Sequence, residues 1–133
     1  MNFSQVTKWD YKLLIIFSIV FLVLDMSWIT IFSKMFNPMI ENIQKSPVKI
    51  NYIGAVLAYL VMLISYYNLV YDGNVPNYYK AALLGFAIYG TYEFTNLATI
   101  TGWDYKILII DIIWGIFVSV FSLYLTDMIY KKL

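Results

Sequence analysis

The stretch LLIIFSIVFLVLDMSWITIF, from Leu13 to Phe32, decides the fold expected of this chain. Apart from two serines, one threonine and Asp25, it is apolar. About 20 residues of this kind are enough to cross the hydrocarbon core of a bilayer as an α-helix. The stretch therefore predicts a transmembrane helix, and it places a carboxylate inside that helix.

Three further apolar stretches of comparable length follow it along the chain. Of the 133 residues, 62% are hydrophobic and only 13% are charged. No Gly/Ser/Pro-rich linker or low-complexity tract separates the stretches, so little sequence is left for a soluble domain. We expect a single domain, residues 1–133, with an all-α fold: an integral membrane four-helix bundle whose spans lie at about 13–32, 48–70, 79–98 and 107–130.

The residue types that are missing exclude many functions. The chain has no cysteine and no histidine, which removes thiol nucleophiles, disulfides and the usual zinc and haem ligands. All of its cations are lysines at the rims of the spans, so a buried Schiff-base lysine is not expected. No basic stripe points to a nucleic acid. We predict no cofactor and no nucleic-acid partner, and an enzyme is the less favoured interpretation.

The first apolar run and the distribution of lysines indicate how the chain is oriented in the membrane. The first apolar run carries Asp25 and Trp28 and has no small-x-small cleavage site, so we expect it to stay as the first helix. With four spans, both termini share one side of the membrane. The positive-inside rule then favours cytoplasmic termini, from the lysines counted on each side: Lys8, Lys12, Lys80, Lys131 and Lys132 against Lys34, Lys45, Lys49 and Lys106.

Two near-identical segments, WDYKLLII (9–16) and WDYKILII (103–110), raise the question of an internal duplication. In each, the aspartate is expected to cap the following helix, with tryptophan and tyrosine at headgroup depth. The next matching pair, Asp25-x-x-Trp and Asp111-x-x-Trp, lies sixteen residues beyond the first tryptophan but eight beyond the second. The registers disagree, so we interpret the copies as similar interfacial chemistry at opposite membrane faces.

Local signals mark the remaining helix boundaries. Ser46-Pro47 is predicted to open the second helix as N-cap and first-turn proline. Asp72-Gly73 predicts a turn, and Asn77 is expected to cap the third helix. Residues 37–43, which begin Asn-Pro and continue with Met39, Ile40 and Ile43, are predicted to form a short helix in the interface.

Three carboxylates lie inside the predicted spans. Asp25 is late in the first helix, Glu93 late in the third and Asp111 early in the fourth, and the helix directions bring all three toward the face opposite the termini. A charge facing lipid is costly, so such groups normally face the bundle interior, pair with one another, or mark an ion or proton path. We therefore predict an ion- or proton-binding site at these three acids.

Polar and small residues accompany the acids at helical spacing. Gly85, Tyr89, Glu93 and Asn96 form one stripe on the third helix. On the fourth helix, Asp111, Gly115, Val118 and Ser122 form another, and the glycines are expected to let the two backbones approach. The residues predicted to support the acids are Trp28, Tyr89, Tyr92, Thr95, Asn96, Trp114 and Gly115. The competing interpretation is that the acids only bond these side chains and lock the bundle.

A family resemblance rests on several of these residues. The run 89–99, YGTYEFTNLAT, is followed by Gly102-Trp103 and then by Asp111-Ile-Ile-Trp-Gly115. Together they resemble the signature of a family of small, mostly bacterial four-span membrane proteins of unknown function. Its pattern is Y-G-T-Y-[D/E]-x-T-N-x-A-T, then G-W, then D-x-x-W-G, with D-x-x-W in the first helix. The family usually has Asp where this chain has Glu93. The resemblance implies a fold and a site, and no established activity.

Three classes of function remain open at this stage. We favour a protein that binds or moves a small cation or a proton, with Asp25 and Asp111 as primary ligands and Glu93 as an adjustable third. Such a transporter would be expected to form homo-oligomers in the lipid bilayer, since 133 residues leave little room for a pore. A structural or assembly subunit is the first alternative. The second is a membrane enzyme that uses paired carboxylates on a lipid or peptide.

Overall fold

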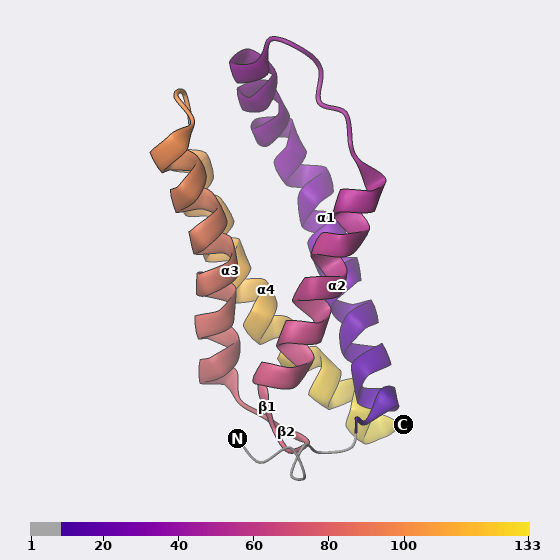
Figure 1. Ribbon diagram of the computed structural model, residues 1–133. Helices are drawn as coiled ribbons and strands as arrows, with labels where there is room; N and C mark the ends of the chain where they lie inside the picture. The colour runs from indigo at the N-terminus through magenta and orange to yellow at the C-terminus, as the bar shows by residue number, and fades with distance from the viewer. Residues whose placement is uncertain (1–8) are drawn as a thin grey trace.

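The computed structural model describes residues 9–133 and consists almost entirely of helices (Figure 1). Lys8, used in the orientation argument, and the start of the chain considered for a signal peptide lie outside the described residues. The elements are α1 (Tyr11–Gln44), α2 (Tyr52–Leu69), β1 (Tyr71–Asp72), β2 (Val75–Pro76), α3 (Tyr78–Thr99) and α4 (Tyr105–Lys132). The two strands form only a small antiparallel hairpin. The predicted all-α class is confirmed.

Within residues 9–133, three helices are long and apolar enough to cross a bilayer: α1, α2 and α4. This confirms the predicted integral membrane class. Helix α3 has 22 residues, which corresponds to about 33 Å of helix. It is less apolar than the other three, because Lys80, Glu93, Asn96 and several threonines interrupt it.

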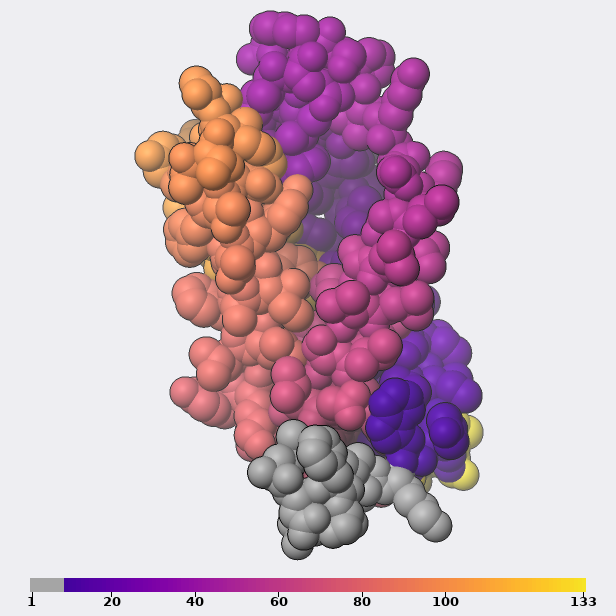
Figure 2. Space-filling model, viewed as in Figure 1, coloured from indigo at the N-terminus to yellow at the C-terminus, as the bar shows by residue number. Residues whose placement is uncertain are grey.

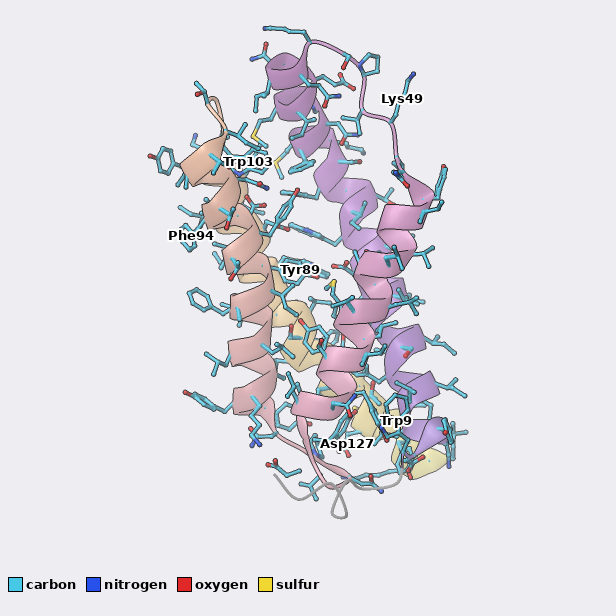
Figure 3. All side chains as sticks on the ribbon, in the orientation of Figure 1. Trp9, Lys49, Tyr89, Phe94, Trp103 and Asp127 are labelled. Atoms are coloured by element: carbon cyan, nitrogen blue, oxygen red, sulfur yellow. The ribbon has the colours of Figure 1, made fainter. Side chains whose placement is uncertain are left out.

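The ends of the molecule carry different parts of the chain. Trp9 and Asp127 lie at one end, called the terminal end here, and Trp103 lies at the other, the distal end (Figure 3). Trp9 is 40% exposed, whereas Trp103 is 5% exposed. The prediction that the two tryptophans differ in packing environment is confirmed, and their predicted location at opposite membrane faces stays a prediction. Trp103 is buried within the bundle, and its predicted location at headgroup depth stays a prediction.

Three predicted helix caps are confirmed. The Asp10 side chain accepts a hydrogen bond from the amide of Leu13 at 3.1 Å, and the Asn77 side chain accepts one from Lys80 at 3.0 Å. Asp104 accepts from the first turn of α4. Each side chain satisfies an amide that has no partner within its own helix. The WDYK copies therefore share a capping role although their tryptophans do not share an environment.

The second helix begins later than predicted. Its N-cap is Asn51, whose side chain accepts from the amide of Gly54 at 3.1 Å, not Ser46-Pro47. The backbone carbonyls of Ser46 and Pro47 instead accept hydrogen bonds from the Gln44 side chain at 3.0 and 3.1 Å. These bonds tie the segment after α1 to the end of α1, so the next helix starts only where Asn51 supplies a cap.

The predicted interfacial helix at residues 37–43 does not exist as a separate element, because α1 continues through Pro38 to Gln44. Proline removes one helical hydrogen bond, but packing compensates here. Met39, Ile40 and Ile43 contact a distal core around Trp103. The apolar side chains that suggested an interfacial location are partly buried against this distal core.

Helices α3 and α4 lie side by side at the distal end and diverge toward the terminal end (Figure 1), and glycines allow their close approach. A Cβ atom added to Gly85 would overlap the Gly115 carbonyl and the Ser119 hydroxyl. A Cβ added to Gly115 would lie 2.6 Å from the Cβ of Tyr89. The predicted contact of the two glycine stripes is confirmed, and it brings Tyr89 and Asp111 to the same interface.

Helix α2 packs unevenly against the rest of the bundle. Near the terminal end, Tyr66 is fully buried in the main core with Phe17 and Phe21. Near the distal end, Tyr52 and Val56 are 75% and 58% exposed. Figure 2 shows the molecule hollowed between the magenta α2 and the orange end of α3 in this distal half. The bundle is thus tightly closed at one end and open on one side at the other.

Candidate functional site: two buried acidic centres

Asp25 lies where all four helices meet. Its side chain is on α1 and is 5% exposed. It accepts hydrogen bonds from the Tyr59 hydroxyl at 2.6 Å, from the Tyr89 hydroxyl at 2.9 Å and from the Trp114 indole N–H at 2.9 Å. These donors come from α2, α3 and α4 respectively. Both carboxylate oxygens therefore have donors, and we call this group the Asp25 centre.

Glu93 and Asp111 form a second group, which we call the acid pair. Glu93 is fully buried, and its Oε2 accepts a hydrogen bond from the Trp103 indole N–H at 2.7 Å. Its Oε1 is buried with no N–H or O–H donor. The Asp111 side chain, 7% exposed, lies in hydrogen-bonding range of the Glu93 carboxyl. A carboxylate oxygen buried without a donor is costly, unless its neighbour carries a proton.

A tryptophan pair joins the two centres. Trp28 and Trp114 stack with ring centroids 4.7 Å apart and planes at 9°. Trp114, on α4, donates to Asp25 on α1, and Trp28, on α1, donates to Asp111 on α4 at the longer distance of 3.4 Å. Each aspartate thus bonds the tryptophan of the other D-x-x-W segment. The D-x-x-W spacing makes this exchange possible, because residues i and i+3 lie on one face of a helix. The aspartate and the tryptophan of each segment can therefore both face the other helix.

The three predicted acids come together, but not as one site. All three are buried, as expected. In the described part of the chain, however, no group of three or more acidic, histidine or cysteine side chains is placed to hold a metal ion. The prediction that Asp25, Glu93 and Asp111 act as three ligands of one ion is therefore not supported by the geometry of the described residues. The reciprocal tryptophans separate Asp25 from the acid pair.

Some of the predicted supporting residues contact the three acids, and others do not. Trp28, Tyr89 and Trp114 bond the acids directly, and Gly115 makes room for Tyr89. Tyr92 is 50% exposed, packs its ring edge against Trp103, and shares a hydrogen bond with the half-buried Asn96. Neither Tyr92 nor Asn96 donates to an acid among the hydrogen bonds of the described residues.

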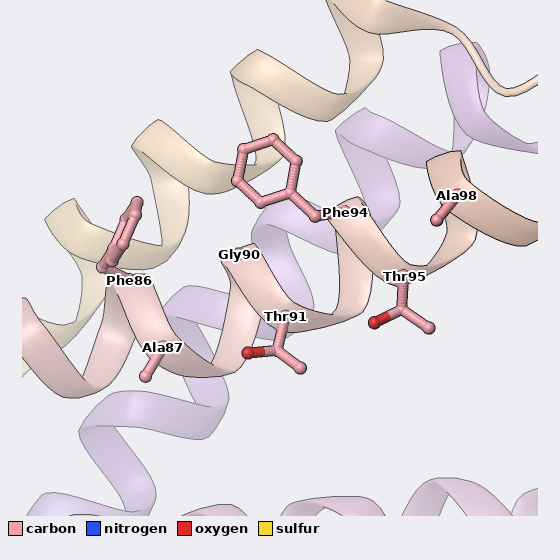
Figure 4. Close-up of a pocket in the computed structure, with 7 residues that line it drawn as sticks. All are labelled: Phe86, Ala87, Gly90, Thr91, Phe94, Thr95 and Ala98. Carbon is pink, nitrogen blue, oxygen red and sulfur yellow. The ribbon is translucent and has the colours of Figure 1, made fainter.

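Thr95 lies away from the acids. It is exposed and lines a shallow pocket on α3 together with Thr91, beside the row formed by Phe86, Gly90 and Phe94 (Figure 4). Its position two residues beyond Glu93 turns it to the other side of the helix. The prediction that Thr95 would support the acids is wrong. Thr95 is close to Glu93 in the sequence but does not contact the acids.

Two residues of the site were missed by sequence reasoning. Tyr59 was overlooked because α2 carries no acid, although a tyrosine in the middle of an apolar span was a signal that its hydroxyl needs a partner. Trp103 was assigned to the interface. It reaches Glu93 because Gly102 adopts φ 92°, a left-handed conformation that turns the chain back over the bundle. The adjacent Gly-Trp in the sequence was the signal for this turn.

The fold and the two centres define the class: a multi-pass helical membrane protein with carboxyl groups bonded inside the bundle. Within this class, the chain belongs to the family described as "Predicted membrane protein (DUF2177)", whose model matches residues 11–127. No curated protein and no solved structure matches the chain. The family is of unknown function, so the geometry of the centres carries the functional argument.

Proposed function

We propose that this protein binds a proton at the acid pair, Glu93 and Asp111, and exchanges it with the two sides of the membrane. The observation that supports this most directly is the buried Glu93 Oε1, which has no hydrogen-bond partner among the described residues and belongs to the carboxyl group next to Asp111. Two neighbouring carboxyl groups can share a hydrogen bond only when one of them is protonated. The pair would therefore hold a proton that can be lost and regained.

The charges near the acid pair favour neutralisation by a proton and not by a positively charged side chain. The ion pairs of the described residues join Lys80 to Asp72 and Lys131 to Asp127, both near the terminal end. Between residues 9 and 133, neither Glu93 nor Asp111 forms an ion pair with a lysine. A buried carboxylate that lacks a cation is strongly disfavoured in low dielectric. Protonation removes this cost without a ligand cage, whereas a metal ion would need more acidic ligands than the pair provides.

Asp25 has a different role in this proposal from the one expected from the sequence. Three donors from three helices occupy its oxygens. A carboxylate that accepts bonds from three helices holds them together, and three of its roughly four acceptor positions are already used. We propose that Asp25 fixes the helices around the acid pair, and the structural alternative therefore applies to this residue.

Proton exchange requires that the acid pair can be reached from both sides of the membrane. We therefore also propose how the chain crosses the membrane. We propose that α3 is a fourth span, since its length of 22 residues is sufficient and it packs along α4. The termini would then be cytoplasmic, and the hollow between α2 and α3 (Figure 2) would open on the outer half. Lipid or a second copy of the chain would cover the open side of α2.

The topology can be tested with single cysteines, because the chain has none.

In that topology test, Asn74→Cys in the hairpin and Lys132→Cys at the terminus are expected to react with a membrane-impermeant thiol reagent from the cytoplasmic side only. Thr101→Cys, in the turn between α3 and α4, is expected to react from the outside only. If Asn74→Cys and Thr101→Cys react from the same side, α3 does not span the membrane.

The function itself is tested by proton flux. Purified protein is reconstituted in liposomes that contain a pH-sensitive dye, and an imposed pH gradient is followed with the counter-ion carried by valinomycin and K⁺. Wild type is expected to dissipate the gradient faster than empty liposomes. Asp111→Asn and Glu93→Gln are expected to abolish this flux, because an amide keeps the shape but cannot exchange a proton at this pH.

The matched control is Asp104→Asn. This variant makes the same chemical change on the same helix, but at an exposed cap where asparagine serves as well as aspartate. It is expected to keep wild-type flux. Absence of flux in wild type, or equal flux in wild type and Asp111→Asn, would reject proton exchange and leave the acids with a structural role.

A further inference from the structure

Trp103 lies between the acid pair and the distal end of the bundle (Figure 3). It follows Gly102 in the turn after α3, yet its side chain is buried. Its indole N–H donates to Glu93 Oε2 at 2.7 Å. The ring therefore reaches back past the last six residues of α3, a helical rise of about 9 Å. It separates a buried carboxyl group from the end of the molecule.

The side chains around Trp103 are apolar and come from three helices: Phe36 and Ile43 of α1, Leu97 and Ile100 of α3, and Leu108 of α4. Leu97 and Ile100 follow Glu93 along α3, and Leu108 precedes Asp111 along α4, so these residues lie on the distal side of the acid pair. Their side chains offer no group to which a hydrated proton can bond. The distal core thus closes this side of the acid pair.

The turn that carries Trp103 is held against the end of α1. The Asp104 amide donates to Met39 Sδ at 3.2 Å. A Cβ atom added to Gly102 would lie 3.3 Å from Ile43 Cγ1, and the φ of 92° at Gly102 is one that other residues rarely adopt. These contacts fix the backbone of the turn. The Trp103 side chain itself is tied to the bundle by packing and by its hydrogen bond to the acid pair.

We propose that Trp103 is a gate that closes the acid pair to the distal side, and that its hydrogen bond to Glu93 holds this gate shut. A proton exchanged with the distal side passes only when this bond breaks and the ring moves aside. The inference rests on the proposed proton exchange, and it names the residue that controls one of the two sides. Trp103 acts through Glu93 and is therefore a positioning residue.

The charge of Glu93 decides how firmly the gate is held. A hydrogen bond from an N–H to an ionised carboxylate is about twice as strong as one between two neutral groups. While Glu93 carries negative charge, the indole is held strongly. When Glu93 is protonated, the bond weakens and the ring is released more easily. A proton bound at the acid pair thus loosens the gate through which it leaves, and its departure restores the stronger bond.

The bond is tested with Trp103→Phe, which removes the indole N–H and keeps an aromatic ring. The matched control is Trp9→Phe, the same change in the near-identical segment 9–16, at an exposed tryptophan of the terminal end (Figure 3). Protein in micelles is treated with a water-soluble carbodiimide and glycinamide, which convert accessible carboxyl groups to amides. The modified residues are identified by mass spectrometry.

Glu93 of wild type is expected to stay unmodified, while the exposed Asp104 reacts. Trp103→Phe is expected to speed the modification of Glu93 at least about tenfold, which corresponds to 1.4 kcal/mol, and Trp9→Phe should not change it. If Trp103 only packs, the phenyl ring keeps Glu93 protected, and this result overturns the gate. Equal modification of the buried Asp25 in Trp103→Phe also overturns it, because the whole bundle would then have loosened.

The link to the charge of Glu93 is measured by nuclear magnetic resonance with Trp103 unaltered. The indole N–H of Trp103 is expected to exchange with deuterium more slowly than that of Trp9. Glu93→Gln, which offers a neutral acceptor of the same shape, is expected to accelerate this exchange severalfold at Trp103 and to leave Trp9 unchanged. The same exchange rate at Trp103 in wild type and Glu93→Gln would overturn a gate held by charge.

Proton flux separates failure of the gate from failure of the proposed function. Flux is expected to rise in Trp103→Phe, because the gate opens more often, and to stay at the wild-type value in Trp9→Phe. If wild type carries no flux, the proposed function fails, and the modification of Glu93 still decides whether Trp103 closes the acid pair. If Asp111→Asn abolishes flux but Trp103→Phe changes neither flux nor the protection of Glu93, proton exchange stands and the gate is wrong.

Discussion

The Asp25 centre and the acid pair use similar residues in opposite ways. Each contains a buried aspartate followed three residues later by a tryptophan, and each aspartate accepts the indole N–H of the other segment. Asp25 also receives two tyrosine hydroxyls, so all of its bonds are to donors. Asp111 faces Glu93 instead, a second acid. In the proposed function, this third partner decides whether a buried carboxyl group holds helices together or exchanges a proton.

The two centres also belong to different cores. The partners of Asp25 pack with the main core around Phe17, Phe21 and Tyr66. The acid pair is bonded to Trp103, which belongs to the distal core with Leu108 and Ile112. Both centres are buried, and the hollow beside the distal half of α2 (Figure 2) lies on the side of the distal core. The following predictions test this difference, from the largest expected effect to the smallest.

The largest effect is expected for Asp25→Ala. The change leaves the hydroxyls of Tyr59 and Tyr89 and the N–H of Trp114 buried without an acceptor, and the free energy of unfolding should fall by about 3 kcal/mol or more. Asp25→Asn keeps one acceptor oxygen and should lose clearly less. Both are measured by unfolding in mixed detergent micelles. Equal losses for Asp25→Ala and Glu93→Gln would remove the distinction between the centres.

The next effect is expected for Gly115→Ala, which disturbs the Asp25 centre indirectly. The added Cβ would lie 2.6 Å from the Cβ of Tyr89, so Tyr89 must move and its bond to Asp25 weakens. Overpacking of this kind costs about 1–3 kcal/mol of unfolding free energy. The control is Gly90→Ala, whose Cβ would meet no atom closer than 3.8 Å and should be neutral or stabilising. Similar melting temperatures for both variants would contradict the close approach.

Smaller effects on stability are expected at the acid pair. Glu93→Gln supplies an amide N–H that can donate to Asp111, so the free energy of unfolding should change by less than about 1.5 kcal/mol. Infrared spectra of wild type should contain the C=O band of a protonated carboxyl group, and Glu93→Gln and Asp111→Asn should each remove or shift it. A band that persists unchanged in both variants would place the protonated group elsewhere.

The smallest effect is expected at Asp72, an acid in water at the terminal end. Hydrogen bonds from Lys80 at 2.6 Å and then from Asn77 hold the pKa of Asp72 below its usual value of 3.8. Because the folded pKa is the lower one, this contact stabilises the hairpin above pH about 4, and the contribution is lost as the pH falls through the folded pKa. The carboxyl carbon shift, followed by nuclear magnetic resonance, should titrate below 3.8, and Lys80→Met should return it upward.

Asp72→Asn is the matching flux control for the terminal end. Since Asp72 belongs to neither centre, its loss should leave proton flux unchanged. A large decrease would mean that surface acids, and not the acid pair, limit exchange.

Much of this molecule follows from the sequence by itself. The length and apolarity of LLIIFSIVFLVLDMSWITIF determine that α1 crosses a membrane, because the backbone in lipid must bond to itself. The cost of charge in lipid determines that Asp25, Glu93 and Asp111 turn inward. The caps at Asp10, Asn77 and Asp104 are local events within one turn of helix, and they could be predicted for that reason.

Only the tertiary structure decided which acid bonds to which partner. The swap of Trp28 and Trp114 between Asp25 and Asp111, the contribution of Tyr59, and the return of Trp103 to Glu93 all depend on how helices far apart in the chain cross one another. The course of α1 through Pro38 likewise depends on the distal core that covers it. Helical periodicity determines which face a residue occupies, but a hydrogen bond across helices requires their relative rotation and distance, which no single segment encodes.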